Sequence, residues 1–295
     1  MRSIPVTSSP PVPEVFPIYP DLEGKVALIT GIGQVGPLDS PSWGNGASTA
    51  RLLARNGVFI YGCDLDLTVA ERTKQRLLEE TPKAVVDVVA ANVTNLADVE
   101  ALVTGIMQKH GRIDILVNNV GCTTPGNPAT MTEETWNQQM DINLTSVYRL
   151  CHYVLPIMQK QKSGSIINNG SIAALRYLGK HQIAYAAAKA AVIRFTKAIG
   201  VMYGKENIRS NCVVPGMMYT PLVDHFAHSD KPEDQEAAKR MVDHNCPMGW
   251  MGTGHDVGNA VVWLASGASR YVNSHELIVD GGITEHTGMG YNLSA

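Results

Sequence analysis

The 295-residue sequence lacks the features that would take it out of the ordinary globular class, and each absence excludes a kind of function. No stretch reaches the roughly 18 uninterrupted apolar residues that a membrane-spanning helix needs. Residues 1–25 contain no apolar run typical of a signal peptide. The sequence also contains no block of basic residues, which would be the sign of a nucleic-acid-binding protein. We therefore expect a cytoplasmic protein without nucleic-acid or membrane partners.

Cysteine is scarce as well. The five cysteines are odd in number, widely spaced and without a C-x-x-C pair, so we expect neither a disulfide framework nor a metal site.

Charge is nearly balanced, with 24 Lys and Arg against 27 Asp and Glu. The hydrophobic share of 44% is enough for a large core.

Proline is concentrated at the start of the chain. Six prolines in residues 1–20 forbid a helix and predict an extended arm outside the core. From Gly24 onward, short β-branched runs alternate with segments of helical periodicity, and we assign residues 21–295 to one domain.

This alternation predicts seven strands with helices between them. The expected strands are 25–30, 58–63, 84–91, 113–118, 165–169, 208–214 and 277–279. The expected helices are 47–56, 68–80, one capped by Asn95 and ended by Gly111, 133–159, 181–202 and 256–265, with Pro156 near the end of the fourth. Buried strands joined by crossover helices indicate an α/β fold with a doubly wound parallel sheet of the Rossmann type.

The first strand is followed by a glycine-rich turn, where a nucleotide pyrophosphate would meet a helix N-terminus. Two sets of glycines compete. Gly31, Gly33 and Gly36 match G-x-G-x-x-G, but Pro37 follows at once and stops a helix. We favour the set Gly31, Gly44 and Gly46, since its last glycine directly precedes a helical segment.

An acidic residue ends the second strand. Asp64 stands some 20 residues beyond the glycine turn, where a carboxylate accepts hydrogen bonds from the adenosine ribose hydroxyls. The same carboxylate repels a 2′-phosphate, and no Arg or Lys follows it directly. NAD is therefore preferred over NADP; the competing interpretation is that Asp64 only caps the next helix.

Tyr185 and Lys189 stand four residues apart on the helix after the fifth strand. This spacing places the phenol and the ammonium on one helix face, where the positive charge is expected to lower the pKa of Tyr185. Ser171 lies 14 residues upstream, just beyond a strand. Its hydroxyl should therefore emerge at the same edge of the sheet.

With these residues in view, the chain resembles the short-chain dehydrogenase/reductase family over residues 22–282. The motifs that carry the resemblance follow the family's order at compatible separations. They are Thr30-Gly31 with Gly44-Asn45-Gly46, Asp64, Asn118-Asn119-Val120-Gly121, Asn143, Ser171, Tyr185-x-x-x-Lys189, Pro215-Gly216 with Thr220, and Val279-Asp280-Gly281-Gly282.

The resemblance implies an alcohol/ketone oxidoreductase and a role for each matching residue. Tyr185 would be the general acid/base, and Lys189 would lower its pKa and bind the nicotinamide ribose. Ser171 would hydrogen-bond the substrate oxygen, and Asn143 would hold a water in a proton relay. The resemblance further implies a homotetramer or dimer built from the helices 133–159 and 181–202.

The resemblance also implies an NAD site, which involves more residues than the catalytic set. Its expected residues are Gly31, Gly44, Gly46, Asp64, Asn92, Val93, Asn119, Gly121, Tyr185, Lys189, Pro215, Met218 and Thr220.

Three departures from the family pattern stand out. Twelve residues, 32–43, separate the first two glycines where the family has three, which is an insertion of nine. The insertion is expected to alter the pyrophosphate site and to bring Trp43 near cofactor or substrate. Asn92 replaces the usual Asp, although its amide oxygen still accepts from adenine, and Val120 replaces the usual Ala.

Residues 217–251 match the family's substrate lid and are rich in Met and aromatic residues, which suits an apolar pocket as well as core or subunit contacts. The expected substrate contacts are Cys122, Arg176, Tyr177, His181, Met217 and Phe226.

We therefore expect an NAD(H)-dependent enzyme that interconverts a secondary alcohol and a ketone. The expected substrate is a fairly apolar small molecule, and cyclic compounds are included among the candidates. Two alternatives stay open. One is an NADP(H)-dependent ketone reductase. The other is a non-redox isomerase, dehydratase, cyclase or regulatory nucleotide binder on the same fold.

Overall fold

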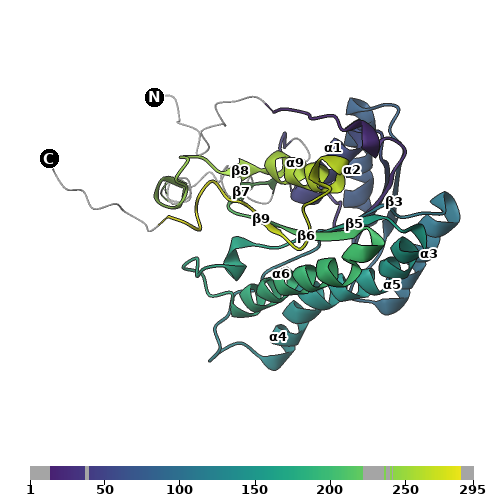
Figure 1. Ribbon diagram of the computed structural model, residues 1–295. Coiled ribbons are helices and arrows are strands. Elements are labelled where there is room, and N and C mark those ends of the chain that lie inside the picture. Colours follow the sequence, from purple (N-terminus) through teal and green to yellow (C-terminus); the bar gives the residue numbers. More distant parts are fainter. Residues whose placement is uncertain (1–13, 37–39, 222–235, 237–239, 241, 287–295) are drawn as a thin grey trace, which may run out of the picture.

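In the computed structural model (Figure 1), a parallel sheet runs through the middle of the molecule, and the structure describes residues 14–36, 40–221, 236, 240 and 242–286. The sheet has seven strands in the order β3-β2-β1-β4-β5-β6-β9, and all its pairings are parallel. Its strands are β1 Val26–Thr30, β2 Phe59–Asp64, β3 Val86–Ala90, β4 Ile115–Asn118, β5 Gly164–Asn169, β6 Ile208–Pro215 and β9 Glu276–Val279. The predicted doubly wound Rossmann sheet is confirmed.

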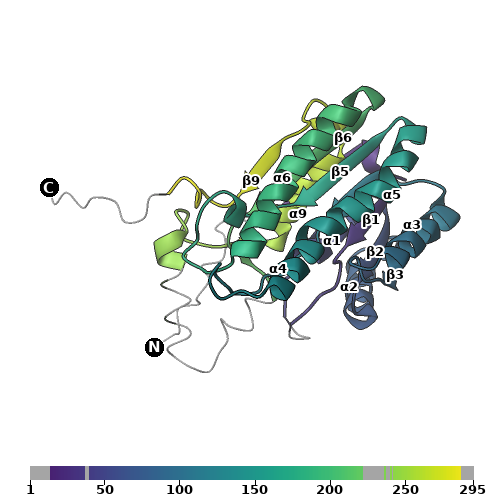
Figure 2. The ribbon, with the colours of Figure 1, turned by 90° about the horizontal axis from the view of Figure 1, so that it is seen from below.

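Helices cover both faces of this sheet. They are α1 Asn45–Arg55, α2 Leu67–Glu80, α3 Leu96–His110, α4 Glu133–Met140, α5 Ser146–Gln161, α6 Ile183–Tyr203 and α9 Gly254–Ala265. Figure 2 shows α3, α5 and α6 together on one face, while α1 and α9 lie on the other. Side chains alternate along each strand, so Ala27 and Ile29 join the core under α1 and α9 whereas Val26 and Leu28 join the opposite one.

The chain connects β6 to α9 through a second, two-stranded parallel ladder, β7 Met218–Tyr219 with β8 Gly252–Thr253. Thr253 and Asp256 then form a capping box that starts α9. At α3, the side chain of Asn95 accepts from two backbone amides, and Gly111 adopts φ 68° at the other end. Both predicted boundaries of this helix are confirmed. Among the described helices, none is long and apolar enough to cross a membrane.

The helix predicted over 133–159 is present as an unbroken helical run of residues 133–161, and the only departure lies inside it. A π-helical turn, Asp141–Thr145, joins α4 to α5, and it carries Asn143 with a fully buried side chain. Pro156 lies inside α5, which nevertheless continues to Gln161. The buried neighbours Leu155 and Met158 offset the hydrogen bond that the proline lacks.

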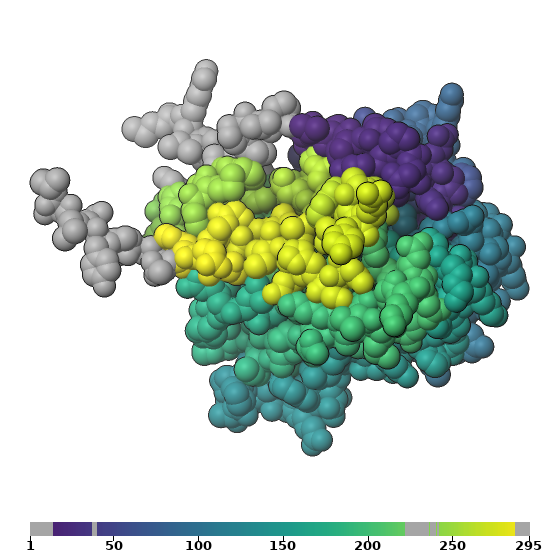
Figure 3. All heavy atoms as spheres, viewed as in Figure 1, coloured from purple at the N-terminus to yellow at the C-terminus, as the bar shows by residue number. Residues whose placement is uncertain are grey.

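The N-terminal arm is not separate from the domain in its described part, contrary to expectation. Phe16 and Tyr19 pack against the core under α1 and α9, and Glu14 forms an ion pair with Arg51 at 3.0 Å. Asn56 fixes the backbone here, since its amide nitrogen donates to the carbonyl of Pro17. In the space-filling view the N-terminal segment, in purple, lies flush against the surface (Figure 3).

Candidate active site

Two cavities open at the carboxyl ends of the strands, and they share one wall. The first, of about 440 Å³, is bounded by the ends of β1, β4, β5 and β6. The second, of about 470 Å³, lies beside it under the segment that follows β6. Ser171, Tyr185 and Gly216 line both. A molecule in one cavity would therefore meet a molecule in the other at Ser171 and Tyr185.

The first cavity begins where the glycine-rich turn meets α1. The helix starts at Asn45, directly after its N-cap Gly44, so the set Gly31, Gly44 and Gly46 opens the helix as predicted. A side chain on Gly46 would collide with the carbonyl oxygen of Gly31 and the amide of Asn119. Glycine therefore keeps the helix N-terminus open to the cavity, which is the arrangement that receives a pyrophosphate.

The insertion is fastened to the domain by side chains at both its ends. The Gln34 side chain is fully buried; its Nε2 donates to the Ser42 carbonyl at 2.6 Å, and its Oε1 accepts from the Gly44 amide at 3.3 Å. From α2, Arg76 donates to the carbonyl of Ser42 at 3.1 Å. Residues 37–39 of the insertion lie outside the described residues.

Trp43 is not among the described residues that line either cavity, although the adjacent Gly44 lines the first, so the structure does not support the expectation that the insertion brings this side chain to cofactor or substrate. Its ring is sandwiched in cation–π contacts, with the Arg76 guanidinium 4.0 Å and the Arg51 guanidinium 5.0 Å from its centroid. Arg51 also lies 4.9 Å from the ring of Phe16. The indole is only 7% exposed because these arginines and α1 cover it.

The residues expected at the adenosine end lie outside the lining of the first cavity. Asp64 Oδ2 accepts from the Gly33 amide at 2.8 Å and so orients the glycine turn. The interpretation that Asp64 caps the next helix is wrong, because Asp66 accepts from Thr68 and caps α2. Asn92 uses its Oδ1 on the backbone and hydroxyl of Thr94, while Val93 is buried.

Tyr185 and Lys189 project from α6 into the first cavity, as their spacing predicts. The Lys189 ammonium lies 5.7 Å from the Tyr185 ring centroid and donates to the Asn169 carbonyl at 2.7 Å. Burial raises the pKa of Tyr185, and a hydrogen bond from Ser171 opposes that rise. Burial is the largest of these effects, so the net shift of the Tyr185 pKa is upward, opposite to the net lowering that the spacing predicts.

Lys189 itself is strongly affected by its surroundings. Only 2% of the residue is exposed, and burial lowers its pKa from 10.5 to about 8. Gly121 is part of the reason that the ammonium has room, since a Cβ there would lie 3.0 Å from Nζ.

Asn143 is held by the loop that follows β4. Its amide nitrogen donates to the carbonyls of Cys122 and Gln139, both at 2.9 Å, and its Oδ1 accepts from the Cys122 amide at 3.1 Å. The side chain therefore fixes this loop beside Lys189. Cys122 is exposed and is not among the described residues that line the two cavities.

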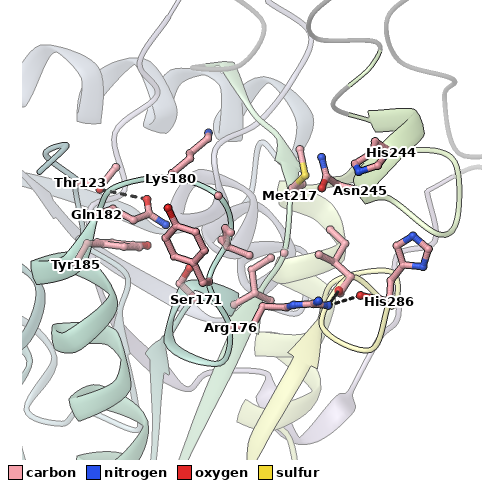
Figure 4. Close-up of a pocket in the computed structure, with 16 residues that line it drawn as sticks. Thr123, Ser171, Arg176, Lys180, Gln182, Tyr185, Met217, His244, Asn245 and His286 are labelled. Carbon is pink, nitrogen blue, oxygen red and sulfur yellow. Dashed lines mark hydrogen bonds between the residues drawn. The ribbon is translucent and has the colours of Figure 1, made fainter. Parts of the chain in front are cut away.

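Most of the expected residues do line the cavities. The first cavity contains Gly31, Gly44, Gly46, Asn119, Gly121, Tyr185, Lys189, Pro215, Met218 and Thr220. The second contains Arg176, Tyr177 and Met217 (Figure 4). His181 lines a separate small cavity of about 120 Å³ that Arg176 and Tyr177 also border. Phe226 and most of the expected lid lie outside the described residues.

The sequence interpretation missed several lining residues. In the second cavity these are Thr123, Ile172, Leu178, Gly179, Lys180, Gln182, His244, Asn245, Ile283 and His286. Lys180 and Gln182 lie between Ser171 and Tyr185 in the sequence, and this position could have identified them as residues that line the cavity. Ile283 and His286 follow the last strand. Their segment is held at the cavity by a contact between residues distant in the sequence, in which Arg176 donates to the Ile283 carbonyl at 2.8 Å, and no local sequence pattern predicts this contact.

The chain is similar to known enzymes along most of its length. Residues 42–284 match the profile of the family described as enoyl-(acyl carrier protein) reductase. A 3-oxoacyl-[acyl-carrier-protein] reductase of Thermotoga maritima is 33% identical over 89% of this chain and 98% of its own. Levodione reductase of Leifsonia aquatica is 34% identical over 88% of this chain and 93% of its own.

Solved structures agree with these relatives. A protein from Burkholderia xenovorans, described as a short-chain dehydrogenase/reductase, superimposes with a TM-score of 0.82 at 39% identity, covering 90% of this chain and 98% of its own. A crystal structure of levodione reductase gives a TM-score of 0.81 at 31% identity, covering 89% and 98%.

Proposed function

Because the chain belongs to the short-chain dehydrogenase/reductase family of nicotinamide-dependent oxidoreductases, we propose that it interconverts a secondary alcohol and a ketone with NAD(H). The observation that carries this proposal is the wall shared by the two cavities. Ser171 and Tyr185 stand where a cofactor in the first cavity would face a substrate in the second.

The first cavity fits a dinucleotide. Its glycines leave the α1 N-terminus open, and Gly121 leaves room beside Lys189. A bound nicotinamide supplies or accepts the hydride. The protein then has to move one proton and stabilise one oxygen.

Tyr185 is the proton donor toward a ketone oxygen. Because burial raises its pKa, the phenol retains its proton at neutral pH, as an acid requires. Ser171 donates a hydrogen bond to the same substrate oxygen. The Lys189 ammonium stabilises the phenolate left after transfer and binds the nicotinamide ribose, while Asn143 positions the loop around it and holds a water that returns the proton.

The preference for NAD over NADP rests on Asp64. Its carboxylate lies at the end of β2 and adjoins the glycine turn through its hydrogen bond with Gly33. A second negative group, such as a 2′-phosphate, would be repelled there. Asn92 and Val93 complete the adenosine end of the proposed site.

The substrate that we propose has a fairly apolar body. Ile172, Leu178, Met217 and Ile283 give the second cavity an apolar part next to Tyr185. Similarity to levodione reductase adds cyclic ketones to the compounds worth testing.

A spectrophotometric screen tests this function. NADH and NADPH are each offered with a panel of linear and cyclic ketones, and NAD and NADP with the corresponding alcohols, while absorbance of the reduced nicotinamide is followed. We expect turnover with NAD(H). Turnover only with NADP(H) would favour the NADP(H)-dependent ketone reductase, and absence of turnover with the entire panel would favour a non-redox protein.

A further inference from the structure

The second cavity carries an excess of positive charge on a protein whose net charge is −3. Among the described residues that line it, Arg176 and Lys180 are permanent cations, His244 and His286 are further basic groups, and none is a carboxylate. The local sign is therefore opposite to that of the whole chain. Resting on the proposed function, we infer that the substrate carries an anionic group, a carboxylate or a phosphate, remote from the reacting carbonyl.

The positions of the basic residues support this reading. Figure 4 shows Arg176, His244 and His286 on the side of the cavity remote from Tyr185. Lys180 lies in the loop between Ser171 and Tyr185 and borders the same cavity. A substrate whose carbonyl meets Tyr185 would therefore extend its far end toward cations. At about 470 Å³ the cavity is within the size range of small-molecule sites.

Within the described part of the chain, Arg176 is held in place by backbone carbonyls and not by a carboxylate. Its Nη1 donates to the backbone carbonyls of Ile283, Thr284 and His286, and none of these partners is negatively charged. The Nε and Nη2 groups have no hydrogen-bond partner among the described residues. A guanidinium fixed by one nitrogen and open at the other two is suited to an anion.

Lys180 provides the second charge. It is exposed, and no carboxylate of the described residues forms an ion pair with it. Gln182 and Thr123, which contact each other at 3.5 Å on the same wall, add neutral hydrogen-bonding groups nearer to Tyr185. The cavity thus combines apolar side chains with Lys180, Gln182 and Thr123 on one side, and with Arg176, His244 and His286 on the side remote from Tyr185 (Figure 4).

The test compares matched anionic and neutral carbonyl compounds with the full-length enzyme and the cofactor found in the screen. Linear oxocarboxylic acids of about six to ten carbons are compared with their methyl esters, since such chains suit a cavity of this size. For the phosphate case, 6-oxoheptyl phosphate, whose anion lies five carbons from the carbonyl, is compared with the uncharged 7-hydroxyheptan-2-one. We expect kcat/KM to favour the anion by about ten- to a hundredfold in at least one pair, the value of a charge-assisted hydrogen bond. The pair that shows the preference identifies the anion as carboxylate or phosphate.

Lys180→Gln is expected to lower the ratio of acid to neutral kcat/KM by about tenfold, mostly through KM. Lys205→Gln removes the same charge from an exposed position at the start of β6, at the other end of the sheet, and should leave the ratio as it is. Raising the ionic strength should reduce the preference in the unmodified enzyme, because exposed charges are screened.

Two results would overturn the inference. If neutral compounds are reduced as well as or better than their anionic partners, the anion site is wrong while the oxidoreductase function stands. If an anion preference is found but Lys180→Gln and Lys205→Gln change it equally, the preference does not arise in this cavity. Failure of every carbonyl compound, anionic or neutral, would instead remove the proposed function on which the inference rests.

Discussion

Gln34 closes the insertion by donating from its side-chain amide to the carbonyl of Ser42 at 2.6 Å. These two residues stand eight positions apart, and the same side chain accepts from the Gly44 amide that immediately precedes α1. The helix N-terminus that we propose for the pyrophosphate is thus positioned by a fully buried amide side chain. The described residues at the two ends of the insertion are therefore tied to the turn.

Replacing Gln34 by Ala should therefore weaken dinucleotide binding. We expect the dissociation constant for NADH to rise about tenfold and the free energy of unfolding to fall by about 1–3 kcal/mol, since two backbone groups lose a buried partner. Fluorescence titration and chemical denaturation measure the two effects. Gln75→Ala, on the exposed face of α2, is the matched control. A loss of stability with unchanged NADH affinity would show that the insertion does not shape the pyrophosphate site.

Tyr185→Phe removes the proposed proton donor and leaves the ring in place. We expect kcat to fall at least about a thousandfold while NADH still binds, because general acid catalysis accounts for a factor of this order. Steady-state rates and NADH titration separate the two. Tyr271→Phe, at a fully exposed tyrosine, should behave as the parent enzyme. Retention of most activity in Tyr185→Phe would refute the role.

Asp64→Asn keeps an acceptor for the Gly33 amide but removes the negative charge, whereas Asp64→Ala removes both. We expect both variants to lose about tenfold or more of the preference for NAD over NADP, since repulsion of the 2′-phosphate disappears. Only Asp64→Ala should also disturb the turn. The measurement is kcat/KM with each dinucleotide. Unchanged preference in both variants would mean that another residue selects the cofactor.

The pH dependence of reduction should reflect Lys189. Burial lowers its pKa to about 8, so the ammonium is present below that pH and is lost as pH rises through it. Without the charge, the phenolate formed at Tyr185 is less stable, and kcat/KM for reduction should decline above about pH 8. Lys189→Arg keeps a positive charge throughout this range. It should be slower at every pH but show no such decline; a parent enzyme with a flat profile to high pH would contradict the assignment.

The sequence allowed prediction of those parts of the fold that depend on local patterns. All seven strands of the sheet lie within two residues of their expected ends. Asn95 and Gly111 bound α3 as expected because caps act within one helical turn. The glycine set was recognisable because a helical segment follows Gly46, although the helix begins two residues earlier than expected, at Asn45.

The remaining features depend on contacts between distant residues. The π-helical turn carries Asn143, whose side chain is hydrogen-bonded to a loop 21 residues away, a contact that periodicity does not reveal. The spacing of Tyr185 and Lys189 is local, but the direction of the Tyr185 pKa depends on burial by the whole fold. Arg176 meets a backbone carbonyl 107 positions later in the chain. The homo-oligomer implied by the family resemblance stays a prediction.

Arg51 joins the two additions that distinguish this chain from a minimal member of its family. Its guanidinium lies between the ring of Phe16 in the arm and the ring of Trp43 in the insertion, and it forms an ion pair with Glu14. A recombinant protein shortened to begin at residue 21 would therefore expose one face of this arginine and loosen its contact with Trp43. Trimming the proline-rich segment to help crystallisation would thus disturb a contact of the insertion that precedes α1, so nucleotide affinity should be compared between the shortened and the full-length protein.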